Sequence, residues 1–349
     1  MKKVLSLLLA LTLVAALAVG CTKTDQGKEP EVGAVEFGLG SVSSIAKSRD
    51  MTGETTARAQ VDTTFAAVSF DSEGRVVTVH IDVAQSRVEF DENMIVTTDR
   101  NAKIRTKKDQ GNDYGMKRVS NIGKEWYEQI AALENWMVGK TIDEIKALKT
   151  KVVDEAHKHV PDIPELTSSV TITVESYIAA VEDAWKNRVA AQGIDKLGLG
   201  YEISIAKSRD MQGETLAQAQ VDTTMAATAF DKDGKVVGTL IDVAQVRVAF
   251  DAEGKVTSDK TAEILTKKKR GDNYGMKRVS NIGKEWYEQI AALENWMVGK
   301  TISEITGLKT KVVDDAHQHV PDVPELTSSV TITVESYLAA VKKAFDTKK

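Results

Sequence analysis

The chain contains one long segment twice, and this duplication limits its fold more than any other feature. Gly38-Leu39-Gly40 recurs as Gly198-Leu199-Gly200, and the stretch from Tyr114 to Ile142 recurs unchanged from Tyr274 to Ile302. The offset is 160 residues throughout, and no insertion interrupts it. Solenoid repeats are about 20–50 residues long, so this spacing indicates two whole domains in tandem. We place the first copy at residues 36-187 and the second at residues 197-346.

Each copy begins with a segment typical of β-structure. Residues 57–70 are rich in Val, Thr and Phe, and residues 75–90 alternate apolar and polar side chains. The intervening Asp71-Ser72-Glu73-Gly74 is a turn sequence, so the region predicts a β-hairpin. A further short strand is expected at residues 94–97.

The second half of each copy is typical of helices. One face of a predicted helix carries four apolar side chains: Trp126, Ile130, Leu133 and Met137. Thr141 and Glu144 form a capping box for a second, short helix, and a last helix is expected from about residue 173 to residue 186. The connector at 187–196 is predicted to extend this last helix. Strands followed by helices predict an α+β fold: two tandem copies of a small domain whose antiparallel sheet, built on a β-hairpin, is packed by C-terminal helices.

The N-terminus predicts a lipoprotein. Lys2 and Lys3 precede an uncharged stretch at residues 4–18 that is shorter than the roughly 20 residues of a membrane span. Ala18-Val19-Gly20-Cys21 then resembles a bacterial lipobox, and Cys21 is the one cysteine in the sequence. We expect a signal peptide at 1-20, lipid attachment at Cys21 and a flexible tether at 21-35. The protein would then be lipid-anchored at the extracytoplasmic face of the cell membrane; the alternative is an ordinary signal peptide with an incidental cysteine.

Charge and motifs argue against several classes of function. The formal net charge is −5 and the isoelectric point about 5.7, which argues against nucleic acid as a partner. The basic run from Lys267 to Arg270 could meet a phosphate or lipid headgroups, but a solvated strand end is the favoured interpretation. His157 and His159 with Asp162 could suggest a metal, but a solvated loop is favoured there too. No motif of a hydrolase or kinase is present.

A Ser/Thr-rich bend before the last helix is the best candidate for a ligand site. Pro161 and Pro164 precede the segment from Glu165 to Ser176, and the second copy repeats it from Glu325 to Ser336. Free backbone N–H groups at a helix N-terminus favour an anion. Ser and Thr also cap helices without any ligand, so capping alone is the competing interpretation.

This bend resembles the acceptor motif of the FMN-binding domain family, which includes peripheral subunits of the Rnf and sodium-pumping NADH:quinone reductase complexes and extracellular flavin lipoproteins. In that family the motif Asp-x-x-Ser/Thr-Gly-Ala-Thr carries FMN, esterified through its phosphate to the last threonine by a flavin transferase. The matching residues here are Glu165, Ser168, Ser169, Val170 and Thr171, and in the second copy Glu325, Ser328, Ser329, Val330 and Thr331. The family's glycine-bearing loop corresponds to Gly115 and Gly275. The sequence differs from the motif by Glu for Asp, Ser for Gly and Val for Ala.

The resemblance implies an electron-transfer flavoprotein more than a substrate-specific enzyme. We expect FMN, attached through Thr171 and Thr331, in a membrane-anchored lipoprotein that relays electrons from membrane redox donors. Trp126, Trp136, Trp286 and Trp296 are expected in the core, with flavin stacking as the alternative. The competing function is a non-redox binding or structural surface lipoprotein with the same fold. Because each copy has its own hairpin and helices, we also expect residues from about 197 to 349 to fold alone.

Overall fold

The computed structural model describes residues 33–349. The predicted signal peptide, Cys21 and most of the predicted tether lie outside the described residues. The fold is α+β, with antiparallel sheets and helices that repeat in the same order in both copies. Within the described residues no helix combines the length and apolar character needed to cross a bilayer.

The first copy contains the following elements in chain order: β1 (Glu36–Ser44), β2 (Arg58–Phe70), β3 (Val76–Glu89), α1 (Lys107–Gln110), η1 (Gly111–Tyr114), η2 (Met116–Arg118), α2 (Trp126–Met137), α3 (Ile142–Lys146), β4 (Thr150–Lys151), β5 (Val160–Pro161), α4 (Pro164–Thr167), α5 (Glu175–Lys186) and β6 (Val189–Ala190). The second copy repeats most of them: β7 (Lys196–Ser204), β8 (Gln218–Phe230), β9 (Val236–Ala249), α6 (Lys267–Arg270), η3 (Gly271–Tyr274), η4 (Met276–Arg278), α7 (Trp286–Met297), α8 (Ile302–Thr306), β10 (Thr310–Lys311), β11 (Val320–Pro321) and α9 (Glu335–Thr347).

Long antiparallel strands form one main sheet in each copy. The strand order is β3-β2-β1-β6 in the first copy and β7-β8-β9 in the second. Side chains alternate between the two faces of a strand, and both faces of β2 are covered. Val61 and Phe65 point to one core, whereas Ala66 and Val68 point to another. This double coverage explains why nearly every residue of β2 is buried.

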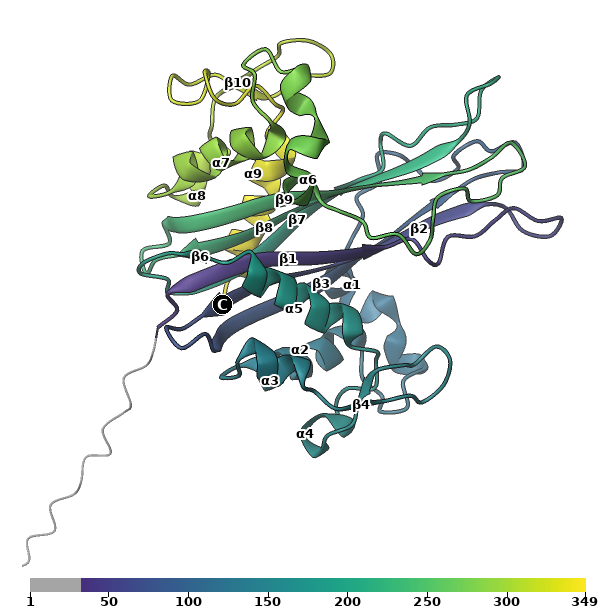
Figure 1. Cartoon of the computed structure of the whole chain (residues 1–349), viewed down its shortest axis with the longest axis horizontal. Coiled ribbons are helices and arrows are strands. Elements are labelled where there is room, and N and C mark those ends of the chain that lie inside the picture. Colours follow the sequence, from purple (N-terminus) through teal and green to yellow (C-terminus); the bar gives the residue numbers. More distant parts are fainter. Residues whose placement is uncertain (1–32) are drawn as a thin grey trace, which may run out of the picture. The chain divides into compact units, whose positions relative to one another are not determined.

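The two main sheets pack against each other and share the largest apolar cluster of the described chain. This central core includes Phe65 and Phe90 from the first copy and Tyr201 and Phe250 from the second. The rings of Phe90 and Phe250 lie 5.0 Å apart. The helices cover the outer faces, so the described chain has the layer order helices, sheet, sheet, helices (Figure 1).

Contacts between the copies come in pairs related by the repeat offset. The N–H of Val96 donates to Asp210 Oδ1 at 2.8 Å, and the equivalent N–H of Val256 donates to Asp50 Oδ1 at 3.0 Å. The two copies therefore pack around an approximate two-fold axis, as the subunits of a homodimer would.

The terminal helix of each copy approaches its sheet closely because two glycines remove the side chains between them. A Cβ atom at Gly38 would lie 1.9 Å from the carbonyl oxygen of Ala184, and one at Gly40 would lie 2.1 Å from that of Ala180. The sequence Gly-Leu-Gly thus fixes the contact of α5 with β1, and Gly198 repeats it against α9.

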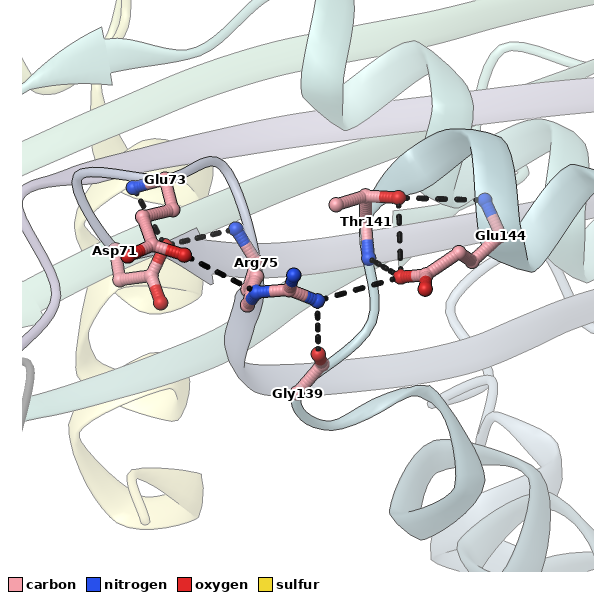
Figure 2. A network of polar contacts seen from close by, with 6 residues as sticks. All are labelled: Asp71, Glu73, Arg75, Gly139, Thr141 and Glu144. Carbon is pink, nitrogen blue, oxygen red and sulfur yellow. Dashed lines mark hydrogen bonds and ion pairs between the residues drawn. The ribbon is translucent and has the colours of Figure 1, made fainter.

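A polar network joins the hairpin turn to the short helix α3 (Figure 2). Asp71 Oδ1 accepts hydrogen bonds from the N–H groups of Glu73 and Arg75 at 2.9 and 2.8 Å. The Arg75 guanidinium donates to the carbonyl oxygen of Gly139 at 3.0 Å and lies 3.4 Å from Glu144. Glu144 closes the capping box with Thr141, so the turn, the helix start and the arginine form one unit.

The structure confirms the hairpin, the buried helical face from Trp126 to Met137 and both capping boxes. Two expectations are wrong. Residues 94–97 form no strand, because Met94 has a positive φ of 58° and only the Phe90–Val96 bridge forms. The connector at 187–196 is not helical, because β6 pairs with the edge of β1. The predicted last helix is confirmed, and it runs from Glu175 to Lys186. The strand β1 itself was not anticipated.

Candidate ligand site in the second copy

The Ser/Thr bend lies between α4 and α5 in the first copy. Glu165 and Ser168 are exposed there, and Ser169 Oγ donates to the carbonyl oxygen of Leu166 at 3.2 Å. The half-buried Thr171 donates through its N–H and its hydroxyl to Gln129 Oε1, at 2.9 and 3.3 Å. The second copy repeats the exposed Glu325 and Ser328, the Ser329 contact and the bonds from Thr331 to Gln289.

The predicted glycine loop lies close to this bend. Gly115 has a left-handed φ of 75° and separates η1 from η2, as Gly275 does with a φ of 80°. Gln129 Nε2 approaches Met116 Sδ at 3.4 Å while its Oε1 accepts from Thr171. One amide side chain of α2 therefore joins the loop to the bend. Glu165 and Ser168 are exposed and form no hydrogen bond with this amide among the described residues.

A cavity of about 990 Å³ opens beside the bend of the second copy. Its lining includes Thr333, two residues beyond the predicted acceptor, and Lys267, Tyr274, Trp286 and Tyr337. The Thr333 hydroxyl is buried and has no hydrogen-bond partner among the described residues. An unpaired buried polar atom is costly unless a ligand or water meets it. The volume is within the range of small-molecule sites.

Lys267 is the most unusual side chain of this cavity. Its Nζ lies 5.1 Å from the ring centre of Tyr274 and 5.3 Å from that of Trp286. Within the described residues no carboxylate lies within 4.0 Å of it to form an ion pair. Burial lowers the pKa of Lys267 to about 8, although the charge of Asp222 opposes this effect. The ammonium group is therefore held between aromatic faces and available to a negatively charged ligand.

Tyr337 supplies a hydroxyl donor to the same cavity. Trp286 Nε1 donates to the Tyr337 hydroxyl at 3.0 Å, so the phenol oxygen accepts that bond and keeps its own proton for another acceptor. Burial raises the pKa of Tyr337 well above its usual value. The phenol therefore stays protonated at neutral pH.

The first copy contains the same inner residues but a different rim. Lys107 Nζ lies 5.0 Å from the Tyr114 ring centre and 5.4 Å from that of Trp126, and the Thr173 hydroxyl is again unpaired. At the second copy's cavity the rim includes Lys103, contributed by the first copy, and Glu202. At the equivalent positions around the first copy, Glu263 corresponds to Lys103 and Val42 corresponds to Glu202.

Sequence reasoning misjudged the basic run from Lys267 to Arg270. It is the short helix α6 and not a solvated strand end. Lys267 lines the cavity, Lys268 pairs with the buried Glu294 at 2.6 Å, and Lys269 pairs with Asp183 of the first copy at 2.8 Å. The recurrence of Lys, Tyr and Trp at the same spacing in both copies was the available signal for the aromatic setting of Lys267.

The structure also locates the predicted core tryptophans and the histidine-containing loop. Trp126 and Trp286 are buried, as expected for core residues, although Trp286 also lines the cavity. His157 Nδ1 lies 2.8 Å from Asp154 in an exposed loop. Among residues 33–349 no group of three or more His, Cys, Asp or Glu side chains is arranged to hold a metal.

Comparison with known proteins adds one distant relative. No protein-family model matches the chain, and no solved structure matches it. Over 151 residues the chain is 29% identical to a protein of Desulfitobacterium hafniense named chlorophenol reductase. The alignment covers 40% of this chain and 46% of that protein, so it spans less than half of the relative's length.

Proposed function

We propose that this protein is a membrane-anchored extracytoplasmic lipoprotein that carries FMN and relays electrons. The observation that carries the proposal is the cavity of the second copy, where the unpaired Lys267 lies between the rings of Tyr274 and Trp286. These groups suit an aromatic ligand with negative charge. The name of the distant relative, a reductase, supports a redox cofactor. When bound, FMN supplies the electron-transfer chemistry through its isoalloxazine ring.

The side chains present fit such a ligand in three ways. Lys267 balances negative charge, the Tyr337 hydroxyl donates a hydrogen bond, and the Thr333 hydroxyl offers a further polar contact. The rings of Tyr274 and Trp286 offer apolar faces against which the flat ring of such a ligand would stack. The bound ligand is thereby held by the second copy, and the rim residue Lys103 brings the first copy to the same site.

Two threonines compete as the point of covalent attachment. The family resemblance favours Thr331, whose hydroxyl is engaged with Gln289 at 3.3 Å. The cavity favours Thr333, which is one of its lining residues and whose buried hydroxyl has no hydrogen-bond partner among the described residues. Covalent attachment at either residue would prevent the loss of the flavin by dissociation and dilution outside the cell.

The test is co-expression with the host's flavin transferase, followed by denaturing electrophoresis and intact mass. We expect a fluorescent band whose intensity falls, in Thr331→Ala or in Thr333→Ala, to the part that the first copy carries at Thr171. Thr327→Ala, at an exposed threonine of the same segment, should leave the intensity unchanged. Lys267→Met should weaken non-covalent FMN binding at the second copy by about ten-fold, the effect of losing one charged contact. Lys232→Met, at an exposed lysine of the hairpin turn outside the cavity lining, is its control. Colour that is lost on denaturation would indicate non-covalent flavin. Protein without any flavin would refute the proposal and leave the non-redox binding lipoprotein.

The anchor is tested separately. The lipobox-like sequence ending at Cys21 leads us to propose lipid attachment to its sulfur. Cys21→Ala should abolish incorporation of a labelled fatty acid and release the protein from the membrane fraction. Retention of both label and membrane association by this variant would reject the lipoprotein assignment.

A further inference from the structure

Two ion pairs join the short helix that follows the long hairpin in each copy, α1 or α6, to the terminal helix of the other copy. Lys343 Nζ on α9 lies 2.6 Å from Asp109 Oδ2 on α1. Lys269 Nζ on α6 lies 2.8 Å from Asp183 Oδ2 on α5. All four side chains are largely shielded from solvent, with exposed fractions between 16% and 30%.

The two pairs occupy equivalent positions with opposite polarity. The repeat offset places Asp109 in register with Lys269, and Asp183 in register with Lys343. The first copy is therefore acidic at both positions and the second copy is basic at both. The approximate two-fold axis brings the two positions together across the interface, one from each copy.

We infer that this charge inversion selects the pairing of a first copy with a second copy and disfavours the pairing of like copies from two chains. If two first copies packed in the same way, Asp109 would face Asp183. If two second copies did so, Lys269 would face Lys343. Either arrangement places like charges together in a shielded interface, which is unfavourable, and specificity depends on such differences between partners.

Much of the apolar surface cannot make this distinction. The central core uses equivalent positions from both copies, such as Val61 with Val221 and Phe90 with Phe250. These positions would match in a pairing of like copies, whereas Phe65 corresponds to Met225 and Thr78 corresponds to Gly238, which packs against Phe37. The pairs Arg100–Asp210 and Lys260–Asp50 have the same polarity in both halves, so they would form in any pairing and do not discriminate.

A neighbouring difference reinforces the inversion. The hydroxyl of Tyr201 bonds to Asp109. The equivalent residue in the first copy is Ser41, whose N–H donates to Asp183 at 2.8 Å and whose carbonyl oxygen accepts from Lys269 at 3.3 Å. The Tyr201 hydroxyl of the second copy thus meets the acidic Asp109 of the first copy, and the Ser41 carbonyl oxygen of the first copy meets the basic Lys269 of the second.

The experiment uses the full chain and reverses the terminal-helix charges. The double variant Asp183→Lys with Lys343→Asp places like charges together in the native pairing and opposite charges together in the pairing of like copies. The quadruple variant adds Asp109→Lys and Lys269→Asp, which restores opposite signs in the native pairing with the polarity reversed. The control is Glu182→Lys with Lys342→Asp, which makes the same charge changes one residue away but disturbs only pairs within a copy.

Each protein is unfolded in urea, refolded at high concentration and analysed by size-exclusion chromatography with light scattering. We expect a several-fold larger fraction of dimers and higher species for the double variant than for the control, and a return to the level of the unmodified chain for the quadruple variant. Equal fractions in the double variant and the control would overturn the inference, whatever happens to stability. Failure of the quadruple variant to reverse the change would also overturn it, because then polarity is not the cause.

Discussion

His80 lies on β3 where the two main sheets meet. Its Nε2 is 2.9 Å from the carbonyl oxygen of Leu197 on β7. A carbonyl oxygen only accepts, so Nε2 carries the proton in the neutral ring. Burial, together with the charges of Lys349 and Lys108, lowers the pKa of His80 to about 4, against the opposing charge of Glu134. The residue is therefore neutral in the folded protein over a range of pH in which it is charged in the unfolded chain.

This shift predicts a specific sensitivity to acid. The unfolded chain binds a proton at His80 below about pH 6.5, whereas the folded protein does so only near pH 4, so stability falls as the pH falls through this window. His80→Leu, which introduces the residue of the second copy at Leu240, should remove the loss. We expect the free energy of unfolding of the unmodified chain, relative to this variant, to fall by about 3 kcal/mol between pH 7 and pH 4. Urea titrations at several pH values measure it; parallel pH profiles for the two proteins would contradict the prediction.

At the scale of elements, the contact of β1 with α5 depends on the absence of side chains at two positions. The helix backbone occupies the space that a Cβ atom of Gly38 would need. Backbone atoms cannot move aside as a flexible side chain can, so the whole helix would have to shift away from the sheet.

Gly38→Ala should therefore destabilise the protein by about 3 kcal/mol, the upper part of the usual range for overpacking. Gly53→Ala is the matched control, because a Cβ atom there meets nothing within 4 Å; it should change stability by less than about 0.5 kcal/mol. Urea unfolding of both variants measures the difference. Similar stabilities for the two would show that α5 adjusts easily to the added methyl group.

Local patterns predicted the elements that local chemistry determines. The turn at Asp71 to Gly74 follows from Asp71 accepting N–H groups two and four residues on, and the capping box at Thr141 follows from its own sequence. The connector could not be judged in this way, because Val189 and Ala190 become a strand only through pairing with β1. The cavity was missed for the same reason: Lys267, Trp286 and Tyr337 are far apart in the chain, and packing alone brings them together.

At the scale of the whole molecule, the two copies share a core that neither could complete alone. The inner face of the second copy's sheet places Val221, Met225, Val246 and Phe250 against the first copy. Sequence alone led us to expect the second copy to fold independently, because it has its own hairpin, helices and cap. The shared core reverses that expectation, because removal of the first copy exposes a large apolar face to water.

We therefore predict that residues 192–349 expressed alone bind a hydrophobic dye strongly, associate non-specifically and lack a cooperative unfolding transition. The exposed face cannot be covered efficiently by a second identical fragment, because Lys269 and Lys343 would then face each other. Addition of residues 33–191 as a separate fragment should suppress dye binding and restore cooperative unfolding as a one-to-one complex, since it supplies both Asp109 and Asp183 and the missing half of the core. Light scattering, dye fluorescence and urea titration of each fragment and of the mixture measure these effects. A monomeric 192–349 fragment that unfolds cooperatively without binding dye would show that the sheet-to-sheet core is dispensable, and that the duplicated domain is autonomous after all.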